Sequence, residues 1–358
     1  MPAKSVISID AMGGDHGPSV TVHGVESFLK THGANRARFL LHGDQAAIEG
    51  ARARCPLARE ACAVRHTDLD IAMDEKPAVA LRRGKGSSLW NAISSVKAGE
   101  AGATVSAGNT GALMALSKLI LRMSMPGLDR PAIVASWPTV KGHTAVLDVG
   151  ANVNSDADQL VEFAIMGEAF HRAVHHVEKP TIGLLNVGSE DMKGREEVRG
   201  AAEMLKSGTF DLDYRGFVEG DDIAKGTVDV VVTDGFTGNI ALKTAEGVAK
   251  FIAGLLKESL TSSLTSRLGA LLAMPALKRM SQKIDPNANN GGPLLGLNGI
   301  VVKSHGSATP AGYGAAIRVA VELARSDYLI KVSDSFSRLT AVLEQPPASA
   351  EPAMETPQ

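Results

Sequence analysis

The chain has 358 residues, 44% hydrophobic and 21% charged, so it can bury a large core and has the composition of an ordinary globular protein. Its formal net charge of -2 gives no basic surface for nucleic acid, which is therefore a poor candidate partner. The only cysteines, Cys55 and Cys62, lie seven residues apart in a stretch that predicts helix, a spacing that suits neither a metal cluster nor a disulfide scaffold.

The beginning of the chain predicts a strand rather than an export signal. Residues 1–10 lack a basic segment followed by a long apolar core, and no stretch approaches the roughly 18 uninterrupted apolar residues of a membrane span. We therefore expect a cytoplasmic protein with reduced cysteines and without a membrane-spanning helix.

Seven short apolar runs rich in β-branched residues predict strands. In chain order they are residues 6–9, 39–41, 103–105, 144–147, 182–185, 228–233 and 300–302. Helix-like stretches lie between them, one of which begins at the cap cluster Asn154-Ser155-Asp156. This repeated alternation indicates an α/β fold with a doubly wound, mostly parallel sheet.

Five of the predicted strands end in a short loop of Gly, Asn, Asp and similar residues. The loops are residues 10–16, 106–111, 148–152, 186–190 and 234–239. If the strands are parallel neighbours, all five loops lie along one edge of one sheet, where open α/β folds bind their ligands. Each loop alone is explained by a turn or a helix cap, but five at one edge favour an enzyme.

The first loop offers backbone donors for an anion. Gly13 and Gly14 can bring bare N–H groups against an anion at the start of a helix, and His16 can donate to a phosphate oxygen. The glycines do not form the GxGxxG dinucleotide pattern. Taken by itself, the pair is more often a tight turn.

The later loops add mostly uncharged donors. Asn109 and Thr110 lie at the start of a predicted helix, where a capping role is the ordinary alternative. Lys193, just after the fourth loop, is the only lysine in these motifs and can stabilise an oxyanion or a phosphate. Glu190 and Asp191 nearby also allow a surface salt bridge.

Residues 251–283 interrupt the alternation of strand and helix. Leucines recur every four residues from Leu256 to Leu268, and Pro275 lies near the end, which predicts a protruding amphipathic helix or helical hairpin. Five basic residues stand against Glu258 alone. Such a segment can lie on an anionic membrane surface or pack against a second subunit, and the two are compatible.

The end of the chain differs in composition from the rest. Residues 344–358 hold four prolines and almost nothing to bury, which predicts a disordered tail. No linker of similar composition occurs earlier. We therefore treat residues 1–343 as a single α/β catalytic unit that includes the helical segment.

Six motifs resemble, in order, those of the phosphate acyltransferase (PlsX) family of bacterial phospholipid synthesis. They are residues 10–15, 106–112, 147–152, 234–239, 291–296 and 303–306, so that the match runs from about residue 5 to 335. The chain departs from the family once. Where the family has a tyrosine before Gly-Gly-Ala-Pro-Leu-Leu-Gly, this chain has Asn289 followed by Asn-Gly-Gly-Pro-Leu-Leu-Gly.

The resemblance implies transfer of a long-chain acyl group from acyl carrier protein to inorganic phosphate, giving an acyl phosphate for phosphatidic acid synthesis. It implies a Rossmann-like fold similar to phosphotransacetylases and isocitrate dehydrogenases, a homodimer, and no cofactor or metal. It also implies peripheral contact with the membrane and with the downstream glycerol-3-phosphate acyltransferase. The acidic carrier protein is expected to dock on a basic patch, for which residues 251–283 are a candidate.

The resemblance also assigns the site residues, which lie in the matched loops. Lys193 and Asn239 are expected to act on the phosphate and the reacting carbonyl. The predicted donor cradle consists of Gly13, Gly14, His16, Asn109 and Thr110, and the predicted orienting residues are Asp148, Asn152, Asp234 and His305. Asp10 and Asp234 are expected to hold loop backbone.

The loops carry no nucleophile-elbow pattern and neither cysteine, so direct attack by phosphate is preferred over an acyl-enzyme. Two other classes of protein stay open from the residues alone. The first is a nicotinamide-dependent dehydrogenase on a related fold, although this chain lacks the glycine pattern that binds a dinucleotide. A non-catalytic membrane adaptor built around residues 251–283 would need the polar loops only as caps.

Overall fold

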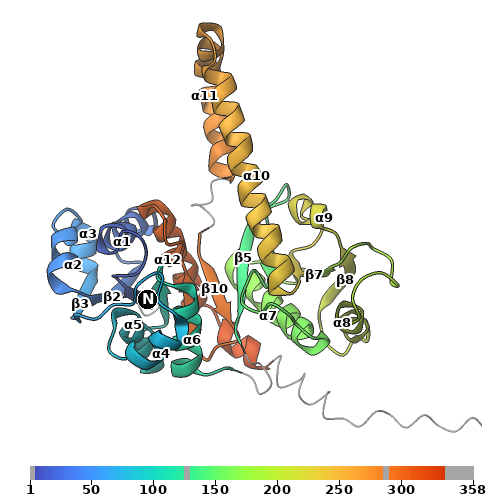
Figure 1. Ribbon diagram of the computed structural model, residues 1–358, viewed down its shortest axis with the longest axis horizontal. Coiled ribbons are helices and arrows are strands. Elements are labelled where there is room, and N and C mark those ends of the chain that lie inside the picture. The colour runs from blue at the N-terminus through green and yellow to red at the C-terminus, as the bar shows by residue number, and fades with distance from the viewer. Residues whose placement is uncertain (1–4, 125–129, 285–289, 335–358) are drawn as a thin grey trace, which may run out of the picture.

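The computed structural model describes residues 5–124, 130–284 and 290–334. Eleven strands in this part of the chain form one sheet, in the order β3-β2-β1-β4-β11-β10-β5-β6-β9-β7-β8. Two lobes of helix and sheet lie on either side of β10 and β5, and a helical hairpin projects from the body (Figure 1). The predicted α/β class with a protruding helical segment is confirmed.

Two sets of parallel strands make up most of the sheet. The first half consists of β1 (Ser5–Asp10), β2 (Ala37–Gly43), β3 (Cys62–His66), β4 (Ala103–Ser106) and β11 (Ile300–Lys303). The second half consists of β6 (His143–Leu147), β7 (Thr181–Leu185), β8 (Asp213–Val218) and β9 (Val230–Val232). Between the halves lie β10 (Gly292–Leu295) and β5 (Ala132–Pro138).

Strand direction reverses between the two halves, because the pairings β11–β10, β10–β5 and β5–β6 are all antiparallel. The halves are also staggered. Val302, near the end of β11, pairs with Pro293, and Leu147, at the end of β6, pairs with Val134 at almost the same level of the sheet. The carboxyl ends of the two halves therefore meet head on in the middle of the sheet.

This arrangement corrects the prediction that all five loops lie along one edge. The loops after β1 and β4 approach the centre of the sheet from one side, and those after β6, β7 and β9 come from the opposite side. The prediction was wrong because it did not include β5 and β10, whose antiparallel pairings reverse the sheet. The loops of both halves still converge on one region.

Helices cover both faces of the sheet. One face packs against α1 (Pro18–His32), α2 (Gln45–Arg52), α3 (Pro56–Ala61), α7 (Ala157–His175), α8 (Glu196–Lys206) and α12 (Pro310–Arg325). On the other face α4 (Pro77–Arg83), α5 (Ser88–Lys97) and α6 (Thr110–Leu121) cover the first half, and α9 (Gly220–Lys225) and α10 (Gly235–Thr261) cover the second. Three apolar clusters hold these layers together.

The seven predicted strands are present as β1, β2, β4, β6, β7, β9 and β11. The predicted cap of α7 is also confirmed, since Asp156 accepts a hydrogen bond from the backbone of Gln159 in a capping box. The helix predicted for the stretch that contains both cysteines is confirmed between them, as α3, but not at the cysteines themselves. Cys55 precedes Pro56, which begins α3, and Cys62 is the first residue of β3.

The helical segment predicted at 251–283 is a hairpin. It consists of the distal part of α10 and of α11 (Leu264–Ile284), which contains Pro275 and folds back along α10 (Figure 1). Large apolar side chains such as Phe251 and Leu272 are exposed on it, at 65% and 85%. Among the described residues, every helix is too short or too polar to cross a bilayer. The predicted tail, 344–358, and Asn289 lie outside the described residues.

Candidate active site

A cavity of about 640 Å³ opens where the two sets of strand ends meet. One end is polar and is lined by residues from both halves. They are Thr110, Gly150, Asn239, Asn290, Lys303 and His305. The other part runs between β5 and α10 and is mostly apolar. The cavity therefore combines hydrogen-bond donors with a hydrophobic groove, as small-molecule sites commonly do.

Asp10 lies beneath the polar end, at the end of β1. Its carboxylate is buried and accepts hydrogen bonds of 2.7 Å from the hydroxyls of Ser88 and Ser106. Burial raises the pKa of Asp10, and these two hydrogen bonds oppose the rise. The carboxylate thus ties the loop after β1 to β4 and α5 through these two serines.

Lys303 places a partly buried cation beside this cluster. Its Nζ donates to the carbonyls of Ala107, at 3.0 Å, and Ser304, at 2.6 Å. Burial lowers the pKa of Lys303 to about 8, although the carboxylates of Asp10 and Asp15 act in the opposite direction. An ammonium group has three protons and two are used here, so the third is available to the cavity that Lys303 lines.

The two glycines of the first loop allow the loops to pack together. A Cβ atom at Gly13 would lie 2.5 Å from Asp10 Oδ2 and 2.7 Å from the backbone nitrogen of Gly108, and Gly14 has a φ of +93°. Asp15 N donates to the carbonyl of Gly306. Gly13, Gly14 and His16 are not among the residues that line the cavity, but their loop contacts Gly306, which is.

Asn109 and Thr110 differ in what they offer the cavity. Asn109 caps α6 by accepting from the backbone of Ala112, and its amide group donates to the carbonyls of Met73 and Glu75. These bonds use both amide hydrogens of Asn109. Thr110 is the member of this pair that lines the cavity.

His305 and Asn290 complete the polar end in the first half. Asn290 accepts a hydrogen bond from the backbone nitrogen of His305 and donates to the Ser304 hydroxyl. Burial lowers the pKa of His305, which favours a neutral imidazole. Asn290 therefore holds the loop that carries His305.

Asp148 organises the loop after β6 in the second half. Its buried carboxylate accepts from the backbone nitrogens of Ile133, Ala151 and Asn152, at 3.0, 3.0 and 2.6 Å, and from the amide of Asn152 at 2.9 Å. Burial raises the pKa of Asp148, opposed by these bonds. The loop places Gly150 against Asn239 at the cavity.

Asp234 begins α10 and thereby positions Asn239. Its carboxylate accepts from the backbone nitrogen of Thr237, at 2.9 Å, and from the Thr237 hydroxyl, at 3.0 Å. It also receives a hydrogen bond from Arg195, so that its charge is paired. This cap starts a helix whose second turn carries Asn239 into the cavity wall.

Lys193 lies on the loop after β7, outside the cavity wall. Its Nζ is 2.7 Å from Glu190 Oε1, and both side chains are more than half exposed. The hydrogen bond to Glu190 raises the pKa of Lys193. The loop adjoins the second-half cluster, because Arg195, two residues further on, contacts Asp234. The surface salt bridge considered from the sequence is present.

Three residues of the candidate site were not identified from the sequence: Lys303, Arg195 and Asn290. Lys303 follows directly after the predicted strand 300–302 and precedes His305 in a matched motif, a signal that could have identified it. Arg195 gave no local signal, because its partner Asp234 is 39 residues away in the chain.

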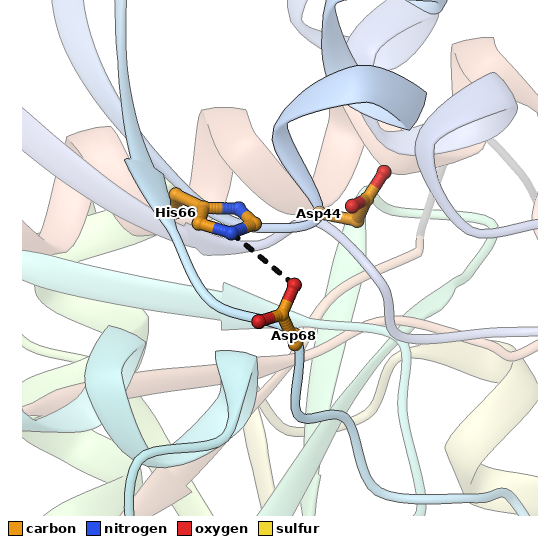
Figure 2. A group of neighbouring side chains, drawn as sticks. All are labelled: Asp44, His66 and Asp68. Carbon is orange, nitrogen blue, oxygen red and sulfur yellow. Dashed lines mark ion pairs between the residues drawn. The ribbon is translucent and has the colours of Figure 1, made fainter.

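Three possible metal ligands, Asp44, His66 and Asp68, lie at the ends of β2 and β3. Figure 2 shows the His66 ring facing Asp68, and the distance from Nε2 to the Asp68 carboxylate is 3.2 Å. The backbone N–H of Gln45 donates to His66 Nδ1, so the ring proton sits on Nε2. A metal at Nε2 would need that proton moved to Nδ1, so we assign the group to surface hydrogen bonding.

The chain is similar to known proteins over nearly its full length. A family model described as "Fatty acid synthesis protein" matches residues 5–331. A phosphate acyltransferase of Caulobacter vibrioides is 63% identical over 341 residues, covering 95% of this chain and 94% of that protein. One of Phenylobacterium zucineum is 58% identical over 353 residues, covering 99% of each chain.

Solved structures with the same fold include a phosphotransacetylase from Streptococcus pyogenes, with a TM-score of 0.60 and 17% identity over 91% of this chain and 96% of that one. The EutD phosphotransacetylase from Staphylococcus aureus has a TM-score of 0.57 and 13% sequence identity, over 90% of this chain and 94% of that one. The predicted similarity of fold to phosphotransacetylases is confirmed.

Proposed function

This chain belongs to the phosphate acyltransferase family, and we propose that it moves a long-chain acyl group from the thioester of acyl carrier protein to inorganic phosphate. It is an acyltransferase of fatty acid and phospholipid synthesis, so the dehydrogenase and the non-catalytic adaptor are set aside. The observation that supports this substrate pair is a single cavity with a polar end next to an apolar groove.

In the proposed reaction, a phosphate oxygen attacks the thioester carbonyl carbon. The carbon–sulfur bond then breaks, the acyl phosphate forms, and the proton of the monohydrogen phosphate ends on the carrier thiol. Phosphate near neutral pH is largely dianionic, judging from phosphomonoesters with a second pKa of about 6, so a strong general base is not required. Positioning of the reactants and stabilisation of the oxyanion supply the catalysis.

The residues of the cavity fit these tasks. Lys303, Thr110 and His305 bind the phosphate at the polar end, with the loop of Gly13, Gly14 and His16 supporting them from behind. Asn239 donates to the oxyanion from α10. Lys193 leaves Glu190 and reaches the phosphate from the neighbouring loop when substrate is present, and Asp148, Asn152 and Asp234 keep that side in place.

Direct attack is favoured because the two cysteines and a serine with a histidine partner near the cavity are badly placed for an acyl-enzyme. Cys55 and Cys62 are buried away from the cavity, and burial raises the pKa of Cys62 to about 12. Ser136 has a histidine partner, with 2.6 Å between its hydroxyl and His175 Nε2. It alternates with Ala135 on β5, so its side chain points to the opposite face, and burial lowers the pKa of His175 to about 3.

The hairpin of α10 and α11 has a separate proposed role in assembly. Its exposed apolar residues suit a second copy of the chain, a membrane surface, or both. Lys257, Arg267 and Lys278 suit the acidic carrier protein, anionic lipid and the downstream acyltransferase at the membrane. Replacing Arg267 and Lys278 with Glu should weaken vesicle binding or raise the KM for the carrier, and no change in either would contradict this role.

The reaction is tested by incubating the protein with palmitoyl acyl carrier protein and phosphate, without nucleotide. Acyl phosphate is trapped with hydroxylamine, and release of the carrier thiol is followed in parallel. We expect phosphate-dependent formation of both products in equal amounts. Thiol release without trapped acyl phosphate would indicate thioester hydrolysis and would contradict the proposal.

A further inference from the structure

The apolar part of the cavity has one wall from β5 and one from α10. On β5, alternate side chains Ile133, Ala135 and Trp137 share one face, and they pack, like Leu242 of α10, against one buried valine-rich cluster. On α10, Leu242, Ala245 and Ala249 line the cavity at helical spacing. The groove between the walls is therefore continuous along both elements.

The groove has a defined direction. At the start of β5, the backbone N–H of Ile133 donates to the Asp148 carboxylate. Asp148 belongs to the loop that places Gly150 against Asn239, so this end of the groove joins the polar site. At the other end of β5, Pro138 leads to Val140, whose backbone nitrogen donates to the carbonyl of Ala224 on α9. From Ile133 to Pro138 the strand rises about 17 Å.

Small side chains keep the groove open. Ala135, Ala245 and Ala249 lie where larger residues would fill the space between β5 and α10. The charged residues of α10 that also line the cavity, Lys243 and Glu246, form an ion pair of 2.9 Å, so their charges offset each other, and both act electrostatically on His305 of the polar part. An uncharged chain can therefore lie in this groove next to side chains that are mostly apolar.

We propose that this groove binds the acyl chain of the substrate, and that Ala245 and Ala249 of α10 limit the length of chain that it accepts. The inference rests on the proposed function, because it requires an acyl donor at the polar end. With the thioester carbonyl beside Asn239, the chain extends along β5 towards Trp137, and carbons further from the carbonyl pass Ala245 before Ala249.

The test replaces each alanine with phenylalanine and measures kcat/KM for acyl carrier proteins loaded with chains of four to eighteen carbons. Each methylene displaced from the groove should lower kcat/KM by about fourfold. The two positions are one turn, about 6 Å, apart. Ala245→Phe should therefore impair medium and long chains, whereas Ala249→Phe should impair only the longest. Four-carbon donors should react as in the wild type, which also shows that both variants are folded.

Thr244→Phe is the matched control, because Thr244 lies on the same helix, is exposed and is outside the cavity wall. It should leave the chain-length profile unchanged. Equal losses for short and long chains in both alanine variants, or an unchanged profile in both, would overturn the groove assignment. If the wild type instead makes no acyl phosphate from any donor, it is the proposed function that fails.

Discussion

Each half of the sheet has a buried aspartate at the end of a strand, and the two aspartates make different contacts. In the first half Asp10 accepts from the serine hydroxyls of β4 and α5 and shares its surroundings with the buried ammonium of Lys303. In the second half Asp148 is bound mainly by backbone N–H groups. The first half thus carries a cation at the cavity, and the second half carries a rigid frame for the neutral Asn239.

This difference separates binding from positioning. A buried lysine costs stability and is retained for what it binds, whereas a carboxylate that accepts several backbone hydrogen bonds stabilises the loop that it organises. Similar loop sequences therefore do not imply similar roles. Substitutions on each side should separate the two roles, and their expected effects differ in size.

The largest effect is expected for the two proposed catalytic residues of the second half. Asn239→Ala and Lys193→Ala should each lower kcat by about 10²- to 10³-fold, because each removes a donor to developing negative charge. Steady-state kinetics with palmitoyl carrier protein measures this. Lys206→Ala is the control, since Lys206 pairs with Asp191 of the same loop region. If both variants keep near-wild-type kcat while folded, these assignments fail.

In the first half, Lys303→Met should lower kcat/KM for phosphate by about ten- to a hundredfold, the value of a hydrogen bond to a charged group. The wild-type activity should also fall as pH rises through about 8, where Lys303 loses its proton. A pH profile of the same shape in Lys303→Met would contradict this role.

The same lysine should make stability depend on pH. Because its pKa is about 8 when folded and 10.5 when exposed, the unfolded chain binds more protons between these values. The free energy of unfolding of the wild type should therefore rise by about 3 kcal/mol relative to Lys303→Met from pH 8 to 10.5. Urea unfolding of both proteins across this range measures the difference, and parallel curves would exclude a buried charged lysine.

The two aspartates should differ in their response to amidation. Asp148→Asn places an NH₂ group opposite backbone N–H groups, which can only donate. The free energy of unfolding should therefore fall by about 3 kcal/mol. Asp10 also accepts from the backbone of Met12 and Gly13. Asp10→Asn should nevertheless cost less, about 1 kcal/mol, because the new NH₂ group can turn to a serine hydroxyl that rotates to accept. Thermal and urea unfolding compare the two, and equal losses would remove the contrast between the halves.

The smallest effect is expected at the exposed partner of Lys193. Glu190→Gln removes a surface ion pair, which should leave the melting temperature unchanged within error. It should not lower kcat, because Lys193 must leave Glu190 to reach the phosphate. A clear fall in kcat would indicate that Glu190 itself takes part in the site.

The sequence was sufficient for the parts that depend on local pattern. Strands with β-branched runs and caps such as Asp156 and Asn109 follow from neighbouring residues. It was not sufficient for β5 and β10, which contain Pro138 and Pro293 and lack alternating apolar character. Those two short strands decide the direction of the second half.

The missed site residues have the same cause. The low pKa of Lys303 arises from burial among loops that are distant in the chain, and Arg195 matters only because Asp234 lies beside it in space. Arg195 does not differ in type or spacing from a surface cation, and the strand end before Lys303 does not show that its ammonium group is enclosed by other loops. Those surroundings become visible only when the packing of the loops is known.

The head-on meeting of the strand ends has an electrostatic consequence. The helix that follows β4, α6, begins at the cavity wall, where Thr110 lies, whereas the first N–H groups of α10 are occupied by the carbonyl of Asn152 and by the carboxylate of Asp234. The amino end of α6 carries a partial charge of roughly half a proton from aligned peptide dipoles. This partial positive charge does not titrate, so part of the attraction for a dianion persists at pH values where Lys303 is neutral.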